Sequence, residues 1–198
     1  YMACMQAGLV SVPLNYRYMS PEIDHALEVS GATLLVAHAE RTQDLNSSKL
    51  VPLLQHGVIY YEASDGSADE FQRLIQPPLA VNPLPTHKPG DPAFIFFTSG
   101  STGKPKGWIL DNQYYLLSGQ RYVELGGLCR VEPGQDRLIT PLPLVHMNAM
   151  ACSTLAMILS GGCVVQLDRF HPRSWWQSVR DSKATLVHYL GVMPAMLL

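Results

Sequence analysis

The sequence predicts an α/β fold with mostly parallel sheets and flanking helices. Short apolar runs alternate with amphipathic segments along the 198 residues, and strands that alternate with helices form βαβ units with parallel strands. Several runs are apolar at consecutive positions, as in strands that are covered on both faces. Hydrophobic residues make up 47% of the chain and charged residues 15%, which is the balance of a globular protein and not of a disordered one.

The predicted strands are apolar runs with the length and composition of β-structure. In chain order they are Leu9–Leu14, Thr33–Ala37, Val58–Tyr61, Ala93–Phe97, Leu138–Leu142, Cys163–Leu167 and Thr185–Tyr189.

The predicted helices lie between these runs. Ser20 and Pro21 predict an N-cap followed by proline at the first helical position, and Gly31 predicts the end of that helix. Ser67 and Glu70 have capping-box spacing. The remaining predicted helices are Asn148–Gly161 and Pro172–Asp181.

A proline-rich segment predicts the domain organisation. Residues 77–92 hold six of the fifteen prolines, which is typical of a linker. We therefore expect an α/β portion at 1–76 and a second α/β portion at 93–198. The chain starts at Tyr1 and stops at Leu198 inside segments with helical character, so we expect it to be a piece of a longer protein.

Charge and cysteine content narrow the classes of function. The net charge of −2 provides no field that would attract nucleic acid or an anionic membrane. The longest apolar stretch, Ala149–Leu159, is far below the ~20 residues that span a bilayer. The four cysteines form no Cys-x-x-Cys pair, which favours reduced thiols in the cytoplasm over a metal site.

The segment Thr98–Gly107, after the predicted strand Ala93–Phe97, has the residue types of an anion-binding loop. It supplies four hydroxyls, three glycines and two of the five lysines in the chain. Glycines allow a positive φ, so that successive N–H groups can converge on one anion. These donors and the two ammonium groups suit a polyphosphate best.

Better-known loops do not fit this segment. Pro105 follows Gly103-Lys104 where a Walker loop needs Ser or Thr, and the glycine spacing is not that of a dinucleotide fingerprint. No Gly-x-Ser-x-Gly occurs around Ser99 or Ser101, which excludes a hydrolase elbow. The remaining alternative is a flexible surface loop, because these are also loop residues.

The order of the residues resembles one family. Phe97–Gly107 is similar throughout to the signature loop of the adenylate-forming (AMP-binding) superfamily, aromatic-Thr-Ser-Gly-Ser/Thr-Thr-Gly-x-Pro-Lys-Gly. Pro143–Ala149 resembles the next motif of that family, Pro-Leu-Phe-His before a helix of small residues, although Val145 replaces the usual aromatic. The resemblance implies part of the large N-terminal domain of an acyl-CoA synthetase-like fold.

The resemblance also implies a reaction. The complete enzyme would join a carboxylic acid to the α-phosphate of ATP, release pyrophosphate and transfer the acyl group to CoA, with Mg²⁺ accompanying ATP. It implies Lys106 as a charged clamp and Lys104 as a solvated side chain. The residues that it implies for the β- and γ-phosphates are Thr98, Ser99, Gly100, Ser101, Thr102, Gly103 and Lys106.

His146 is the second candidate catalytic residue. A single histidine beside an apolar helix is more often a hydrogen-bonded core residue. The resemblance of Pro143–Ala149 to the family motif implies instead that His146 lies near the substrate carboxylate and the acyl or thiol tunnel. The other histidines have no such context and are interpreted as structural or surface residues. A further departure, Asp111-Asn112 where the family commonly has Ser/Thr-His, is expected to alter the capping of the next helix.

Three features of the family are absent from this sequence: the Tyr-Gly-x-Thr-Glu segment, the aspartate that holds the ribose, and the C-terminal domain with the catalytic lysine. The 198 residues alone are therefore expected to be inactive. Two alternatives to an acid–CoA ligase remain: an amino-acid adenylation domain, which usually has Phe-Asp in place of Val145-His146, and a non-catalytic nucleotide-binding fragment. The sequence does not predict which acid is used or the oligomeric state.

Overall fold

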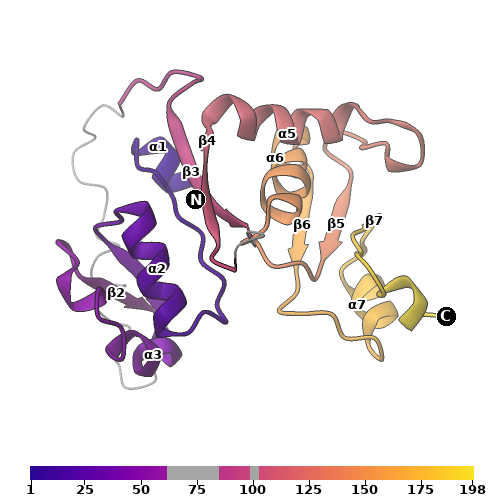
Figure 1. The fold of residues 1–198 in the computed structure, drawn as a ribbon. Coiled ribbons are helices and arrows are strands. Elements are labelled where there is room, and N and C mark those ends of the chain that lie inside the picture. The colour runs from indigo at the N-terminus through magenta and orange to yellow at the C-terminus, as the bar shows by residue number, and fades with distance from the viewer. Residues whose placement is uncertain (62–84, 99–102) are drawn as a thin grey trace. The chain divides into compact units, whose positions relative to one another are not determined.

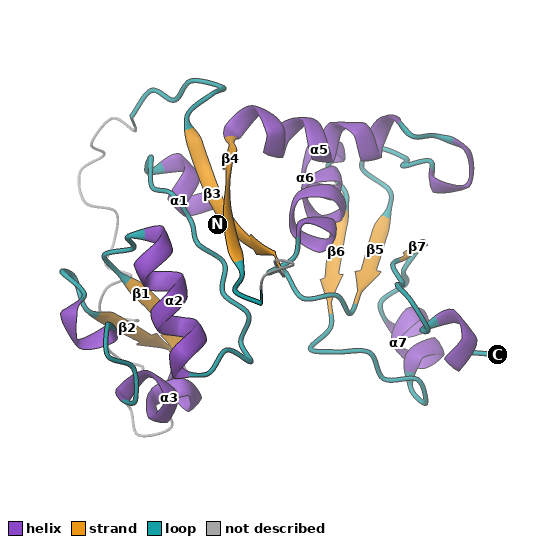
Figure 2. Cartoon of the chain, viewed as in Figure 1, coloured by secondary structure: helices purple, strands orange, loops and turns teal. Residues whose placement is uncertain are grey.

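The computed structural model describes residues 1–61, 85–98 and 103–198. The chain divides into two compact units, Tyr1–Leu110 and Asp111–Leu198, each of which is described by itself (Figures 1 and 2). The predicted capping box at Ser67 and Glu70 lies outside the described residues, as does half of the predicted linker at 77–92, and both stay predictions.

The first unit contains a parallel two-stranded sheet covered by a helix. Strand β1 (Leu35–His38) pairs in parallel with β2 (Val58–Tyr61), with Leu35 opposite Val58. Helix α2 (Ser20–Ser30) buries Ile23 and Leu27 against apolar side chains of both strands. Short helices complete this part: α1 (Met2–Gln6), α3 (Thr42–Asn46) and the 3₁₀ turns Ala39–Arg41 and Val51–Leu53.

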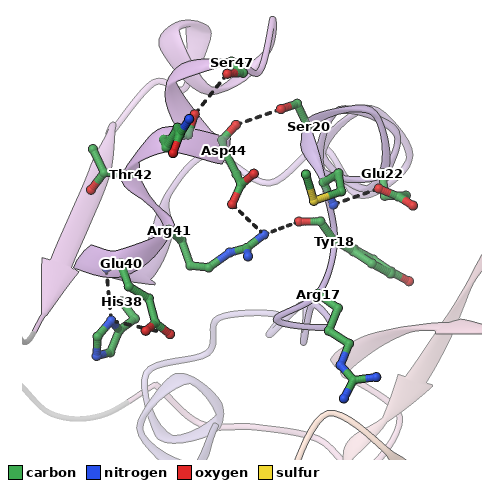
Figure 3. A network of polar contacts seen from close by, with 12 residues as sticks. Arg17, Tyr18, Ser20, Glu22, His38, Glu40, Arg41, Thr42, Asp44 and Ser47 are labelled. Atoms are coloured by element: carbon green, nitrogen blue, oxygen red, sulfur yellow. Dashed lines mark hydrogen bonds and ion pairs between the residues drawn. The ribbon is translucent and has the colours of Figure 1, made fainter.

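Residues close in sequence determine where α2 begins and where it ends. The Met19 N–H donates to the Glu22 carboxylate over 2.8 Å, so Met19 is the N-cap and the prediction that Ser20 has this role is wrong. Ser20 is the first helical residue, and its hydroxyl donates instead to the Asp44 carbonyl, which links α2 to α3 (Figure 3). Gly31 ends the helix as predicted, with a φ of 63° that a glycine adopts without steric cost.

The second strand pair of this unit is formed by β3 (Pro92–Thr98) and β4 (Lys106–Asp111). Ala93, Phe94 and Phe96 of β3 are buried. The predicted strand Leu9–Leu14 is wrong: its only pairing within the described residues is one parallel bridge, Ser11 to Phe94. Pro13 has no N–H to continue a ladder.

The second unit contains a three-stranded parallel sheet in the order β6-β5-β7. The strands are β5 (Arg137–Thr140), β6 (Cys163–Gln166) and β7 (Leu186–Val187). Neighbouring residues of β5 belong to different cores: Leu138 packs with Ala156 and Met157, and Ile139 packs with Trp175. The sheet is therefore covered on both faces, which explains why its strands are apolar at consecutive positions.

The helices of this unit lie on the two faces of the sheet (Figure 2). Helix α5 (Asn112–Glu124) packs with α6 (Leu155–Ser160), and α7 (Trp175–Asp181) carries Trp175 into the other core. The predicted helix Asn148–Gly161 starts as a wide π-helix at Asn148–Thr154 and continues as α6. The predicted helix Pro172–Asp181 is shorter, since residues 172–174 form a turn. The 3₁₀ turns are Gly127–Cys129 and Pro194–Met196.

Candidate active site

The flanks of the predicted phosphate loop are the ends of two paired strands. Thr98 is the last residue of β3 and Lys106 is the first residue of β4, so the sheet fixes where the loop leaves and where it returns. Ser99, Gly100, Ser101 and Thr102 lie outside the described residues, and their assignment to phosphate binding stays a prediction.

Thr98 is held by a residue that the sequence did not single out. The indole Nε1 of Trp108, in β4, donates to Thr98 Oγ1 over 3.2 Å. This contact uses a lone pair of the hydroxyl oxygen and leaves the hydroxyl hydrogen for another acceptor. The signal in the sequence is the tryptophan immediately after Gly107, whose ring can reach across a strand pair.

The two described glycines of the loop have different roles. Gly103 has a φ of +85°, so it confirms the prediction that a loop glycine adopts a conformation unfavourable for other residues. Gly107 has no positive φ within the described backbone. Instead, a Cβ at Gly107 would lie 3.0 Å from Ile95 Cγ2 and 3.2 Å from Val29 Cγ1. Gly107 therefore permits close packing of α2 on the strand pair.

Both lysines of the loop are exposed. Lys106 forms no ion pair with any residue in the described ranges. Its ammonium is therefore not neutralised by a described carboxylate. Because Lys106 also begins β4, its main chain is fixed while its side chain extends into solvent.

His25 contacts the returning flank of the loop, although its sequence context predicts only a structural or surface role. Its Nε2 lies 2.8 Å from the carbonyl oxygen of Pro105. The signal that would have found it is tertiary: 80 residues separate the two groups, and no local pattern connects them.

His146 belongs to the second unit and is exposed. Its N–H donates to the Pro143 carbonyl over 3.2 Å, and its own carbonyl accepts from Met150 N–H over 3.0 Å. The side chain thus stands on a turn before the π-helix Asn148–Thr154, a type of helix that is frequent at functional sites. Within the described residues, the His146 side chain is therefore not part of a buried core, and its role in the active site stays a prediction.

A second histidine of this unit, His188, is part of a buried polar group. Its Nδ1 lies 3.1 Å from Thr140 Oγ1 and 3.3 Å from Ser153 Oγ. Ser153 donates to the Asn148 carbonyl, and Thr140 accepts from Leu142 N–H. Burial of the ring lowers the pKa of His188 below its ordinary value. The neutral ring therefore links β5, the end of β7 and the π-helix, which confirms its structural interpretation.

A cavity of about 260 Å³ lies in the first unit, beside the carboxyl ends of β1 and β2. Arg41, which lines it, is paired: its guanidinium contacts the Tyr18 carbonyl and lies 3.1 Å from the Asp44 carboxylate (Figure 3). His38 lies 3.8 Å from Glu40. Of the predicted site residues that the structure describes, which are Thr98, Gly103, Lys106 and His146, none lines this cavity.

No metal centre is formed within residues 1–61, 85–98 and 103–198, because no three His, Cys, Asp or Glu side chains there come together as ligands. In the same residues, no helix combines the length and the apolar character needed to cross a membrane.

Comparison with known proteins decides the family. The model of the family "AMP-binding enzyme" matches residues 1–198. The chain belongs to the AMP-binding enzyme family. This confirms the resemblance on which the loop Phe97–Gly107 was interpreted.

Two proteins with similar sequences are a CoA synthase and a CoA ligase. A feruloyl-CoA synthase of Amycolatopsis sp is 31% identical over 191 residues, which are 96% of this chain and 35% of that protein. A sulfoacetate–CoA ligase of Cupriavidus necator is 33% identical over 196 residues, or 99% of this chain and 36% of that protein. The chain therefore spans about a third of the length of these relatives.

Two solved structures share the fold of this chain. The inhibitor-bound N-terminal domain of FACL13 from Mycobacterium tuberculosis matches with a TM-score of 0.80 and 21% identity, covering 98% of this chain and 46% of that one. ATP-bound MatB from Rhodopseudomonas palustris matches with a TM-score of 0.79 and 21% identity, covering 100% of this chain and 37% of that one. The predicted fold class is confirmed.

Proposed function

We propose that the complete protein is an ATP-dependent acid–CoA ligase, and that this chain contributes its phosphate loop. The observation that carries the proposal is the arrangement of the loop flanks: Thr98 and Lys106 end and begin two paired strands, with Gly103 at positive φ between them. The similarity to feruloyl-CoA synthase and sulfoacetate–CoA ligase supports the same chemistry.

In the first proposed step, a carboxylate oxygen of the acid attacks the α-phosphorus of ATP. The bond from that phosphorus to the bridging oxygen breaks, and pyrophosphate leaves with the electron pair. Negative charge therefore grows on the bridging oxygen and on the pyrophosphate. Donors that are already oriented stabilise such charge without reorganising during the reaction.

The proposed donors are the hydroxyls and N–H groups of residues 98–103, with the Lys106 ammonium as the charged group. Lys106 suits this role because it is exposed and forms no ion pair with a described residue. Mg²⁺ would enter with ATP as a counter-ion for the phosphates. The described residues offer no ligand cluster for it, so the roles proposed here belong to the donors and the lysine.

In the second proposed step, the CoA thiol gives up its proton, its sulfur attacks the acyl carbon, and AMP leaves with the electron pair of the broken bond. We propose that His146 lies near the substrate carboxylate or the thiol path. Its exposure on a turn supports this role, since a histidine buried by packing could not reach a substrate.

The acid is the open part of the proposal. The relatives named for feruloyl, sulfoacetate, crotonobetaine/carnitine and medium/long-chain fatty acid substrates are 26–33% identical to this chain. These acids differ in charge, aromaticity and length, so similarity at this level does not separate them. ATP and CoA are cytoplasmic pools, and a cytoplasmic location is therefore part of the same proposal.

The deciding experiment measures acid-dependent exchange of labelled pyrophosphate into ATP by the complete protein. Exchange is measured with each acid of a panel that contains hydroxycinnamates, sulfonated short acids, betaines, fatty acids and amino acids. Thioester formation with CoA is then measured for the same acids. Exchange with a non-amino acid, together with thioester formation, is the expected result. Exchange confined to amino acids would identify an adenylation domain instead, and absence of exchange with every acid would contradict the proposal.

A further inference from the structure

One face of α2 contacts the chain on both sides of Lys106. His25 lies one helical turn before Val29, so the two side chains point from the same face. His25 Nε2 lies 2.8 Å from the Pro105 oxygen, while Val29 Cγ1 lies 3.2 Å from where a Cβ of Gly107 would be. Lys106 is the residue between these two contacts.

The polarity of the His25 contact follows from its partner. A carbonyl oxygen can only accept, so Nε2 of His25 carries the hydrogen and donates it. Pro105 has no N–H of its own, and its ring limits φ to about −65°. Its carbonyl is therefore the polar main-chain group through which this residue can be held.

Holding the Pro105 carbonyl also orients Lys106. The carbonyl of Pro105 and the N–H of Lys106 belong to the same planar peptide group, in which a trans bond points them in opposite directions. No cis peptide occurs in the described backbone. A donor fixed on the Pro105 oxygen therefore fixes the direction of the Lys106 N–H and the point from which its side chain starts.

The donor is itself held in place. Helix α2 is capped at both ends, by Met19 with Glu22 and by Gly31, and its inner face is anchored by the buried residues Ile23 and Leu27. The ring of His25 also meets Phe97 edge-on, with 6.4 Å between centroids and 62° between planes. Phe97 precedes Thr98 on the other flank of the loop, so the imidazole contacts both flanks.

We propose that His25 is a positioning residue for the phosphate loop, which holds the Pro105–Lys106 peptide so that Lys106 faces the departing pyrophosphate. The kinetic part of this inference rests on the proposed function, whereas the contact does not. Loss of one hydrogen bond of this kind is expected to change a local opening or binding equilibrium by roughly three- to tenfold.

The test uses the complete protein with the variants His25→Leu, which removes the donor, and His25→Gln, whose amide nitrogen reaches about as far as Nε2. The matched control is His56→Leu, an exposed histidine of the same unit. The first readout is the rate of trypsin cleavage after Lys106, identified by mass spectrometry. Trypsin does not cut at Lys104, because proline follows it. The measured cleavage rate therefore reports on the start of β4.

His25→Leu should raise cleavage after Lys106 by roughly three- to tenfold and raise the KM for ATP in pyrophosphate exchange by a similar factor, with the KM for the acid unchanged. His25→Gln should restore both values to near those of the wild type, and His56→Leu should change neither. Wild-type cleavage and KM in His25→Leu, or an equal change in His56→Leu, would overturn the inference. If the wild type shows no exchange, the proposed function fails, and the cleavage comparison alone decides whether His25 holds the loop.

Discussion

Gly107 lies directly under the side chain of Val29: a Cβ built at Gly107 would come within 3.2 Å of Val29 Cγ1 and 3.0 Å of Ile95 Cγ2. Both distances are shorter than ordinary van der Waals contact. The close approach lets α2 rest on the strand pair that carries the phosphate loop, and it depends on the absence of a side chain at this position.

Gly107→Ala should therefore destabilise the protein by about 1–3 kcal/mol, the usual cost of adding a methyl group to a packed contact. The measurement is the midpoint of urea unfolding. Val29→Ala combined with Gly107→Ala should recover part of the loss, because it removes one of the atoms in conflict. Strict additivity of the two substitutions would show that Val29 and Gly107 do not interact.

Lys106→Ala should lower the rate of acid-dependent pyrophosphate exchange by about 100-fold, the effect of removing one oriented charge stabiliser. The affinity for the acid should hardly change. Lys104→Ala is the matched control, since Lys104 is also exposed and lies in the same loop. Equal losses in the two variants would show that the loop uses its total charge and not a specific clamp.

His146→Ala should change the rate of thioester formation or the selectivity among acids while the melting temperature stays near that of the wild type. The reason is that His146 is exposed, and substitution of an exposed side chain usually changes stability by less than about 0.5 kcal/mol. Kinetics on the acid panel and a thermal melt check this. Wild-type kinetics for all acids would remove His146 from the proposed site.

The stability of the second unit should fall as the pH is lowered below 6.5. Burial lowers the pKa of His188 below its ordinary value of 6.5. The unfolded chain therefore binds a proton at a higher pH than the folded chain does, and stability is lost as the pH falls from about 7 towards the folded pKa.

His188→Asn isolates this contribution. Asparagine places a polar atom near the position of Nδ1, where Thr140 and Ser153 can still contact it, but it does not titrate. The variant should show a smaller decrease in urea midpoint between pH 7.5 and pH 5.5 than the wild type. An identical decrease in both proteins would assign the pH dependence to other groups.

The strand predictions were most accurate for two apolar runs. Val58–Tyr61 is confirmed residue for residue, and Ala93–Phe97 differs from β3 by one residue at each end. Consecutive apolar residues between turn residues predict a strand. Thr185–Tyr189 is reduced to the two residues of β7, which pair with Leu138 and Ile139 of β5.

Helix α5 contains a glycine that is explained by a tertiary contact and not by the local sequence pattern. Gly119 lies inside it, and glycine weakens a helix by about 1 kcal/mol relative to alanine. The structure explains the glycine through tertiary contact: a Cβ there would lie 2.7 Å from Leu155 Cγ of α6. The start of α5 was accessible from the sequence, since Asp111, expected to alter the cap, accepts from Tyr114 N–H over 2.7 Å.

The sequence was sufficient to predict the family and the phosphate loop, but not the contacts that hold the loop. The order of residues in Phe97–Gly107 was sufficient for the family, which the match over residues 1–198 confirms. The contacts of His25 with Pro105 and of Trp108 with Thr98 were not predictable from spacing, because each depends on how an element packs and not on a repeating pattern.

Both flanks of the phosphate loop, and the helix that rests on them, lie in the unit that ends at Leu110. During synthesis, domains generally fold in order from the N-terminus, at about 5–20 residues per second. The chain through Asp111 contains α2, β3 and β4, and every residue of the β6-β5-β7 sheet follows it in the sequence. The contacts of α2 with Pro105 and Gly107 lie within one unit, so they can form without the part of the protein that carries His146.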